Sequence, residues 1–316
     1  MRILVLLLIY AHLTIRAETE LAIDSNWNAV LQKYELGQAT GIAVDSHNHV
    51  FIFHRADRVW EEPMPTNPIL KNTIIMVDIN TGEKLAEWGD EEFIMPHGLS
   101  IDTEDNVWVT DVGGHTVKKF SHNGELLMTL GTASESGTDK NHFNMPADVD
   151  FGPEGDIYIA DGYINTRVIK FNAKGEYLNQ WGEPGSGDGQ LSLPHGISVD
   201  SNGRVFVADR ANSRMQIFTA DGELLKVVNK EIVGRPYGIA NDSEGNVWII
   251  DGGDQPSETR ANIIKLNKQY ESKLNMSTNY DNHSSILGHD IAVSNDGFVF
   301  VVDAWAKRVI KYKKLN

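Results

Sequence analysis

Three histidines of this sequence stand in similar short strings. His97 and His195 each lie in a Pro-His-Gly string, and His289 lies in a Gly-His-Asp string. Neutral imidazole nitrogens are ligands that Zn²⁺ prefers, and three of them around an open position make a zinc site of the catalytic kind. The sequence predicts such a centre if the fold brings the three side chains together.

The histidines fall within a unit that the sequence repeats six times. Each unit alternates apolar and polar residues in short runs, separated by polar turns such as Ser201-Asn202-Gly203, which is the pattern of β-hairpins. Three or four strands in about 40 to 50 residues, repeated, are typical of propeller blades. The predicted fold class is therefore all-β, a six-bladed β-propeller. A β-sandwich is the alternative, but it would not explain the repeat.

The two ends of the chain suggest how the ring closes. The last unit is one strand short, and the segment Trp27–Tyr34 is expected to supply that strand and remove an exposed sheet edge. The units differ most in their connections, where insertions gather on the binding face of such arrays. The predicted insertions are residues 56–73, 132–144, 252–261 and 275–286.

One position, before the Gly or Asp of each first strand, recurs in all six units. In chain order it holds Thr40, His97, Ala147, His195, Tyr237 and His289. The histidines thus occupy alternate units, about 120° apart in a six-fold ring, and they converge if this position lies near the axis. The alternative is three unrelated polar histidines at blade openings.

A second recurring position follows the inner strand. Five units carry an aspartate there, and the first unit carries His54; the aspartates are Asp111, Asp161, Asp209, Asp251 and Asp303. We expect these carboxylates to accept backbone hydrogen bonds at a turn. Arg55 and Arg210 come next in units one and four, where they could grip a carboxylate or pair with aspartates nearby. Tyr163 lies close by in unit three and is a candidate only through these neighbours.

Composition and the N-terminus limit the compartment and the partners. The chain has 316 residues, 28 Lys+Arg against 44 Asp+Glu, a net charge of −16 and no cysteine. This acidic balance argues against nucleic-acid or anionic-membrane partners, and the missing cysteines exclude disulfides and thiolate chemistry. A basic start and a short apolar run predict a signal peptide over residues 1–17, with one propeller domain over residues 18–316. We expect a secreted monomer without a membrane span, with glycosylation candidates at Asn241, Asn275 and Asn282.

Several strings, taken in order, resemble those of the peptidyl-α-hydroxyglycine α-amidating lyases, and the repeat alone resembles the broader NHL class. The resemblance covers residues 25–313, nearly the whole mature chain. The strings are Ile52-Phe53-His54-Arg55, Pro96-His97-Gly98-Leu99-Ser100-Ile101-Asp102, Asn141-His142-Phe143, Asp161-Gly162-Tyr163 and Ala208-Asp209-Arg210. It implies a lyase that forms C-terminally amidated peptide and glyoxylate, supplied with substrate by a separate copper monooxygenase.

The resemblance also implies roles for individual residues. His97, His195 and His289 match the zinc ligands of the family, and Tyr163, Arg55 and Arg210 match its catalytic tyrosine and active-site arginines. A structural calcium ion is implied by the resemblance alone, with ligands at the backbone carbonyls of Ile42 and Leu99 and at the carboxylate of Asp290. Two features depart from the family: Asn144 and Ile164 stand where cysteines are expected, and Leu287-Gly288 precedes the third histidine in place of Met-Pro.

Two other classes of function remain open from the residues. One is a secreted calcium-dependent propeller hydrolase of the lactonase kind, whose metal site is built on carboxylates and Asn rather than on three histidines. The other is a metal-free NHL interaction module.

Overall fold

The chain folds into six antiparallel sheets of four strands each. The computed structural model describes residues 21–254, 261–278 and 287–315. The predicted signal peptide lies outside them. The first three sheets, from first strand to fourth, are β2 (Ala39–Val44), β3 (His49–His54), β4 (Ile74–Asp78), β5 (Lys84–Trp88); β6 (Pro96–Ile101), β7 (Val107–Asp111), β8 (Thr116–Phe120), β9 (Leu126–Leu130); β10 (Asp148–Phe151), β11 (Ile157–Asp161), β12 (Arg167–Phe171), β13 (Tyr177–Trp181).

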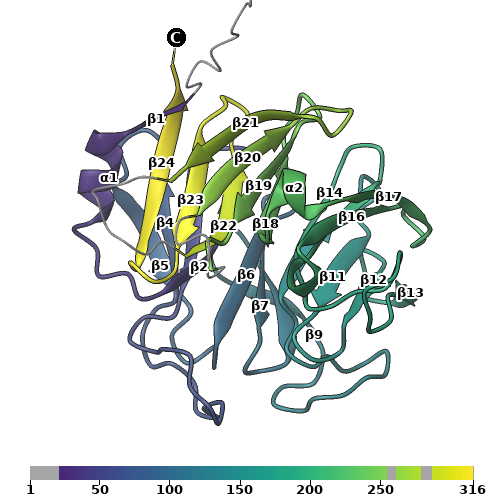
Figure 1. The fold of residues 1–316 in the computed structure, drawn as a ribbon. Coiled ribbons are helices and arrows are strands. Elements are labelled where there is room, and N and C mark those ends of the chain that lie inside the picture. Colours follow the sequence, from purple (N-terminus) through teal and green to yellow (C-terminus); the bar gives the residue numbers. More distant parts are fainter. Residues whose placement is uncertain (1–20, 255–260, 279–286, 316) are drawn as a thin grey trace, which may run out of the picture.

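The other three sheets follow the same plan, and the last borrows a strand from the start of the chain. They are β14 (Pro194–Val199), β15 (Val205–Asp209), β16 (Arg214–Phe218), β17 (Leu224–Val228); β18 (Pro236–Asn241), β19 (Val247–Asp251), β20 (Asn262–Leu266), β21 (Ser272–Ser277); β22 (Gly288–Val293), β23 (Val299–Asp303), β24 (Arg308–Lys314), β1 (Leu21–Ile23). Each first strand contacts the first strands of both neighbouring sheets, which closes the ring (Figure 1). The predicted six-bladed β-propeller is confirmed.

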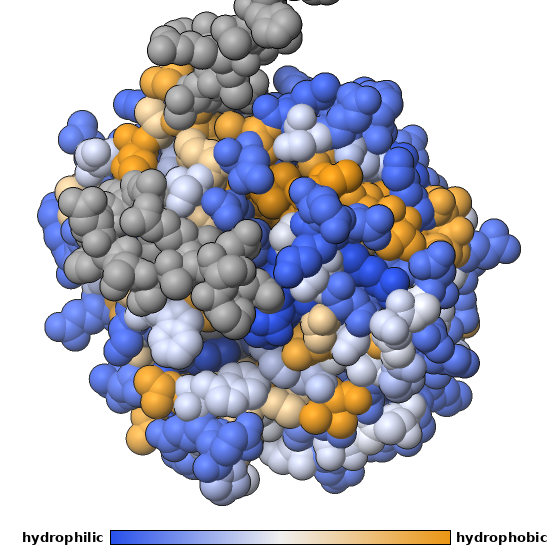
Figure 2. Space-filling view, viewed as in Figure 1, coloured by the Kyte–Doolittle hydropathy of each residue, from blue (hydrophilic) through white to orange (hydrophobic). Residues whose placement is uncertain are grey.

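The hydrophobic core is divided into six parts, one between each pair of adjacent blades. Second strands such as β7 and β19 are buried along their whole length. They therefore read as nearly continuous apolar runs. Fourth strands form the outer edges and carry exposed leucines, for example Leu85, Leu127 and Leu178. Hydrophilic side chains cover most of the face in Figure 2, with apolar residues in patches between them.

Strand β1 closes the ring by pairing antiparallel with β24 (Figure 1). The prediction that the segment Trp27–Tyr34 supplies this strand is wrong, because that segment begins inside helix α1 (Ser25–Leu31). Asp24 explains the helix, since its side chain accepts a hydrogen bond from the backbone of Trp27 at 3.3 Å and so caps the first turn. Trp27 and Leu31 then lie on one face, four residues apart, and are buried between blades six and one.

The predicted insertions are only partly as expected. Residues 56–73 and 132–144 contribute no strand to the six sheets. Residues 275–277, however, are the end of β21. Most of the predicted insertion 252–261 (residues 255–260) and residues 279–286 lie outside the described residues. Two short helices complete the fold, η1 (Arg210–Asn212) and α2 (Lys230–Val233). None of the helices in the described ranges is both long and apolar enough to cross a membrane.

Candidate functional site

The three histidines predicted to converge lie together in the structure. The ring centroids are 4.7 Å apart for His97–His195, 4.7 Å for His97–His289 and 4.8 Å for His195–His289. One ligand nitrogen from each lies within 4.8 Å of the others. All three side chains are buried. This nearly equilateral arrangement follows from their places in blades two, four and six of the ring.

An irregularity at the start of each of these first strands accompanies the histidine. The strand register shifts between Pro96 and Leu99, between Pro194 and Ile197, and between Gly288 and Asp290. Such bulges re-aim side chains. In blade two, the residue after the histidine must be a glycine, because a Cβ on Gly98 would lie only 2.6 Å from the carbonyl oxygen of Ala147.

The recurring position in the odd-numbered blades has a role that the sequence did not suggest. Each histidine Nδ1 lies within hydrogen-bond distance of the backbone carbonyl at this position in the next blade: His97 with Ala147 at 2.7 Å, His195 with Tyr237 at 3.0 Å, and His289 with Thr40 at 2.7 Å. A carbonyl can only accept, so each Nδ1 carries the proton and each Nε2 presents a lone pair.

The surroundings keep these imidazoles neutral. Burial lowers the pKa of His97 and of His195 well below the ordinary value, and the neighbouring histidines and arginines act in the same direction. Burial, followed by the charge of Arg55, lowers the pKa of His289 to about 3. Three neutral imidazoles with oriented Nε2 lone pairs are a donor set that fits a zinc ion.

Tyr163 reaches the histidines from the connection after β11. Its hydroxyl lies 2.9 Å from Nε2 of His97 and 3.5 Å from Nε2 of His195. The phenol ring stacks on Trp60, with centroids 5.3 Å apart and planes inclined by 29°. Trp60 lies in the connection between β3 and β4 of blade one. Connections from two different blades therefore position the Tyr163 hydroxyl beside the three histidines.

Arg55 is a buried charge at the edge of the same site. Its Nε donates to the carbonyl of Pro96 at 3.1 Å, and its Nη1 donates to the side-chain oxygen of Gln38 at 3.0 Å. Its guanidinium lies 5.4 Å from the ring centroid of Trp60. Burial lowers the pKa of Arg55 to about 10, so it stays charged at neutral pH. Neutral partners hold Arg55 in place without cancelling its charge.

Arg210 stacks on a tyrosine that also belongs to the ring of recurring positions. Its guanidinium carbon lies 3.8 Å from the ring centroid of Tyr237, and its Nη2 donates to the Tyr237 hydroxyl. Asp254 lies 3.6 Å away and also pairs with Arg235, so it neutralises Arg210 only in part. The buried Nε of Arg210 makes no hydrogen bond within the described part of the chain. A free, buried donor beside the histidines is suited to an anionic ligand.

The three residues that the resemblance connects with calcium line one cavity on the axis. Ile42, Leu99 and Asp290 border a space of about 190 Å³, together with Asp148 and Asp150. Burial raises the pKa of Asp290 to about 7, while burial and the charge of Asp290 raise that of Asp148. These partly buried carboxylates, with the backbone carbonyls of the strands that line the cavity, are a donor set that fits a hard cation such as Ca²⁺. Asp148 is not among the predicted site residues, because its only signal in the sequence is its place one residue after Ala147.

The recurring aspartates are structural, as predicted. Asp111 accepts backbone hydrogen bonds from Ile94 at 2.8 Å and Met95 at 2.7 Å, and Asp161 accepts one from Asn144 at 2.9 Å. These bonds fix the connection that leads into each first strand. Asp111 therefore holds the connection into the histidine-bearing strand β6, and Asp161 holds the connection into β10 in the same way.

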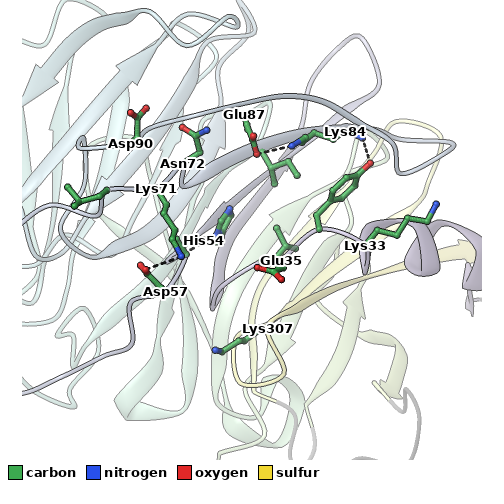
Figure 3. A pocket seen from close by; sticks show the side chains of 15 residues that line it. Lys33, Glu35, His54, Asp57, Lys71, Asn72, Lys84, Glu87, Asp90 and Lys307 are labelled. Carbon is green, nitrogen blue, oxygen red and sulfur yellow. Dashed lines mark hydrogen bonds and ion pairs between the residues drawn. The ribbon is translucent and has the colours of Figure 1, made fainter.

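A cavity larger than the axial one lies elsewhere, beside blade one (Figure 3). It has a volume of about 810 Å³, and four of its charged side chains form two ion pairs, Lys71 with Asp57 at 3.1 Å and Lys84 with Glu87 at 3.0 Å. His54 lies on its wall, with Nδ1 accepting from the backbone of Ala56 at 3.1 Å. Nothing in this lining converges as the histidines do, so the chemistry is assigned to the axial site.

The glycosylation candidates differ in their surroundings. Asn275 is exposed on β21. The side chain of Asn241 lines the axial cavity and donates to the Ser198 hydroxyl at 2.9 Å, so a glycan there would have to displace this contact. Asn282 lies outside the described residues.

Comparison with known proteins gives a family for these features. The NHL repeat family matches residues 93–120 and 191–218, which include His97, His195 and Arg210. The chain is 35% identical to peptidyl-glycine alpha-amidating monooxygenase B of Xenopus laevis. The match covers 92% of this chain but only 35% of the relative, so the chain spans about a third of that protein's length. It is 30% identical to the probable peptidyl-alpha-hydroxyglycine alpha-amidating lyase pgal-1 of Caenorhabditis elegans, with 89% of this chain and 84% of the relative covered.

Two further similarities bear on the alternative functions. The chain is 33% identical to human NHL repeat-containing protein 3, with 90% of this chain and 82% of the relative covered. A solved gluconolactonase structure from Xanthomonas campestris shares the fold, with a TM-score of 0.64, 12% identity, and 89% of this chain and 88% of that chain covered. At that identity, the second similarity reports the propeller fold alone.

Proposed function

Because the chain belongs to the peptidyl-α-hydroxyglycine α-amidating lyase family, we propose that it cleaves peptidyl-α-hydroxyglycine into C-terminally amidated peptide and glyoxylate at the three-histidine site. The observation that carries this proposal is the convergence of His97, His195 and His289 beside the Tyr163 hydroxyl and two arginines. We propose Zn²⁺ as the ion of this site and Ca²⁺ for the cavity of Asp148 and Asp290.

The substrate is a carbinolamide, so the reaction needs no water and no oxidant. The hydroxyl on the α-carbon loses its proton, its oxygen becomes the aldehyde oxygen of glyoxylate, and the C–N bond breaks. The amide nitrogen leaves with the bonding pair and gains a proton. A zinc ion held by the three Nε2 atoms would supply Lewis acidity toward the substrate hydroxyl.

The side chains of this protein bind the substrate and move its proton. Arg210, with its free Nε, and Arg55 would hold the carboxylate and set the α-carbon beside the histidines. The Tyr163 phenol oxygen, 2.9 Å from Nε2 of His97, lies where its phenolate form would accept the proton of the reacting hydroxyl. Trp60 would keep the phenol in that orientation through the stacked contact.

The cellular setting is also a proposal. Residues 1–17 would direct the chain into the secretory pathway as a signal peptide, and a separate copper monooxygenase would supply the hydroxyglycine substrate. The similarity to the amidating monooxygenase of Xenopus laevis supports this pairing of activities.

A substrate comparison separates the proposed lyase from its alternatives. The purified chain is given a peptidyl-α-hydroxyglycine and, separately, an aryl lactone, and glyoxylate and hydrolysed lactone are measured. A lyase releases glyoxylate and leaves the lactone intact. Lactone hydrolysis without glyoxylate would favour the calcium-dependent hydrolase, and no turnover of either would favour an interaction module.

A further inference from the structure

A second cluster of metal-binding side chains lies on the opposite face of the propeller, at the turns that follow the first and third strands. Asp45 lies in the turn between β2 and β3 of blade one and His49 begins β3, while His122 lies in the turn between β8 and β9 of blade two. Asp45 Oδ2 lies 2.8 Å from Nδ1 of His49 and 2.8 Å from Nε2 of His122, and the two nitrogens are 3.3 Å apart. Three ligand atoms from two blades thus converge on one point.

The spacing of these atoms is close to that of a tetrahedral zinc site. Bonds of about 2.0–2.1 Å in tetrahedral geometry place neighbouring ligand atoms about 3.3 Å apart. The two histidine nitrogens already have this separation. The Asp45 oxygen would have to move by only about 0.5 Å to match, a change within reach of a carboxylate rotation.

The carboxylate is held in place before any ion binds. The Asp45 side chain is fully buried, and its Oδ1 accepts backbone hydrogen bonds from His47 at 2.9 Å and His49 at 2.7 Å. Oδ2 is left to face the two imidazoles. On the other side, the ring of His122 packs edge-on against Phe51 with centroids 5.5 Å apart. A metal site needs this kind of support around its ligands.

A fourth ligand is close by. Nδ1 of His47 lies 3.9 Å from Oδ2 of Asp45 and 3.1 Å from Oδ2 of Asp105, and its side chain is 63% exposed and can turn. Asp105 belongs to blade two and accepts hydrogen bonds from Ser46 at 2.6 and 2.9 Å, so the two blades are already joined at this edge. The remaining position is open to His47 or to water.

We propose that Asp45, His49 and His122 bind a divalent transition-metal ion of the zinc class, which cross-links blades one and two. The mixed imidazole and carboxylate donors favour Zn²⁺ over Ca²⁺ or Mg²⁺, which prefer oxygen ligands alone. The ion would fasten one blade to the next on the face away from the three-histidine site. This role is structural and does not depend on the lyase activity.

Zinc binding and thermal unfolding test the proposal. The full chain, dialysed against buffered Zn²⁺, is compared with His122→Gln, which keeps a polar side chain but removes an imidazole ligand. We expect the variant to hold about one zinc fewer per chain than the parent. Added Zn²⁺ should raise the Tm of the parent by a few degrees and leave that of the variant unchanged.

Two further variants exclude other sources of the signal. His142→Ala removes another partly exposed histidine that pairs with an aspartate, Asp139 at 2.9 Å, and should behave as the parent. His97→Ala should lose the zinc of the axial site and keep the Tm response. Equal zinc content and equal Tm shifts in the parent and His122→Gln would overturn the proposal, and so would a response lost only in His97→Ala.

Discussion

At the scale of single residues, the protonation of the histidines decides what the site can hold. Backbone carbonyls fix the proton on each Nδ1, and burial keeps the rings neutral, so three lone pairs meet at one place. The histidine, arginine and tyrosine positions could be predicted from the repeat and the family resemblance. Their carbonyl partners could not, because the backbone of Ala147 carries no sign of its role in the residue type.

Replacing Tyr163 by Phe tests the proton transfer. The phenyl ring can keep its stack on Trp60, so the substitution removes only the hydroxyl beside His97. We expect kcat to fall by about 10²- to 10⁴-fold, the usual contribution of a general acid–base group. Zinc content, measured by elemental analysis, should stay at the parent value. Retention of kcat within a factor of two would remove Tyr163 from the mechanism.

Arg210 is expected to recognise the substrate carboxylate. Arg210→Ala removes a donor of a charge-assisted hydrogen bond, and KM should rise about 10- to 100-fold. An esterified substrate should react poorly with the parent and suffer much less from this change, because the partner charge is already absent. Steady-state kinetics on acid and ester substrates make the comparison. Equal losses on both would assign Arg210 to another role.

His54 is expected to give the protein a defined pH response away from the three-histidine site. Burial lowers the pKa of His54 to about 4, and its Nδ1 accepts backbone hydrogen bonds, which requires the neutral ring. The unfolded chain, with a pKa of about 6.5 at this residue, takes up more protons, so stability is full above pH 6.5 and is lost as the pH falls toward 4.

Between pH 7 and pH 5 this loss amounts to about 2 kcal/mol. Urea unfolding of the parent and of His54→Gln at both pH values isolates the contribution of His54, because the other groups titrate equally in the two proteins. The free energy of unfolding of the variant should depend less on pH by that amount. The same pH dependence in both proteins would show that folding leaves the pKa of His54 unchanged.

At the scale of elements, the repeat predicts the strands within each blade but not the segment that closes the ring. Alternation and polar turns identify the strands of every blade, since each must bury its apolar residues against a neighbouring blade. The prediction for the closing strand is wrong because two apolar residues spaced as Trp27 and Leu31 are fit both a buried strand and the buried face of a helix. The cap from Asp24, and not the apolar pattern, separates the two.

Helix α1 is expected to fasten the ring where the chain ends meet. Trp27 is 1% exposed, and its Nε1 donates to the carbonyl of Asp78 in blade one at 3.0 Å. Trp27→Ala should lower the free energy of unfolding by about 3–5 kcal/mol, measured by urea denaturation. The control Leu70→Ala, at a position 72% exposed, should change it by less than about 0.5 kcal/mol. Similar effects in both would show that α1 does not hold the ring.

At the scale of the whole molecule, the ring converts sequence order into three-fold geometry. Residues in blades two, four and six, far apart in the chain, meet at the axis because the six inter-blade cores space the blades evenly. The convergence of the histidines could therefore be predicted once the number of repeats was known. The contacts of Trp60 and Asp254 could not, since these residues lie in connections that the repeat does not describe.

The most direct measurement is the release of products by the parent and by His195→Ala from a peptidyl-α-hydroxyglycine, with peptide amide and glyoxylate determined together. His195 is buried at the axis and shares no blade with Tyr163 or Arg55. The parent should form amide and glyoxylate in equal amounts. The variant, shown to be folded by its circular dichroism, should not exceed the uncatalysed rate. A variant that keeps the parent rate would contradict the three-histidine site as the place of the reaction.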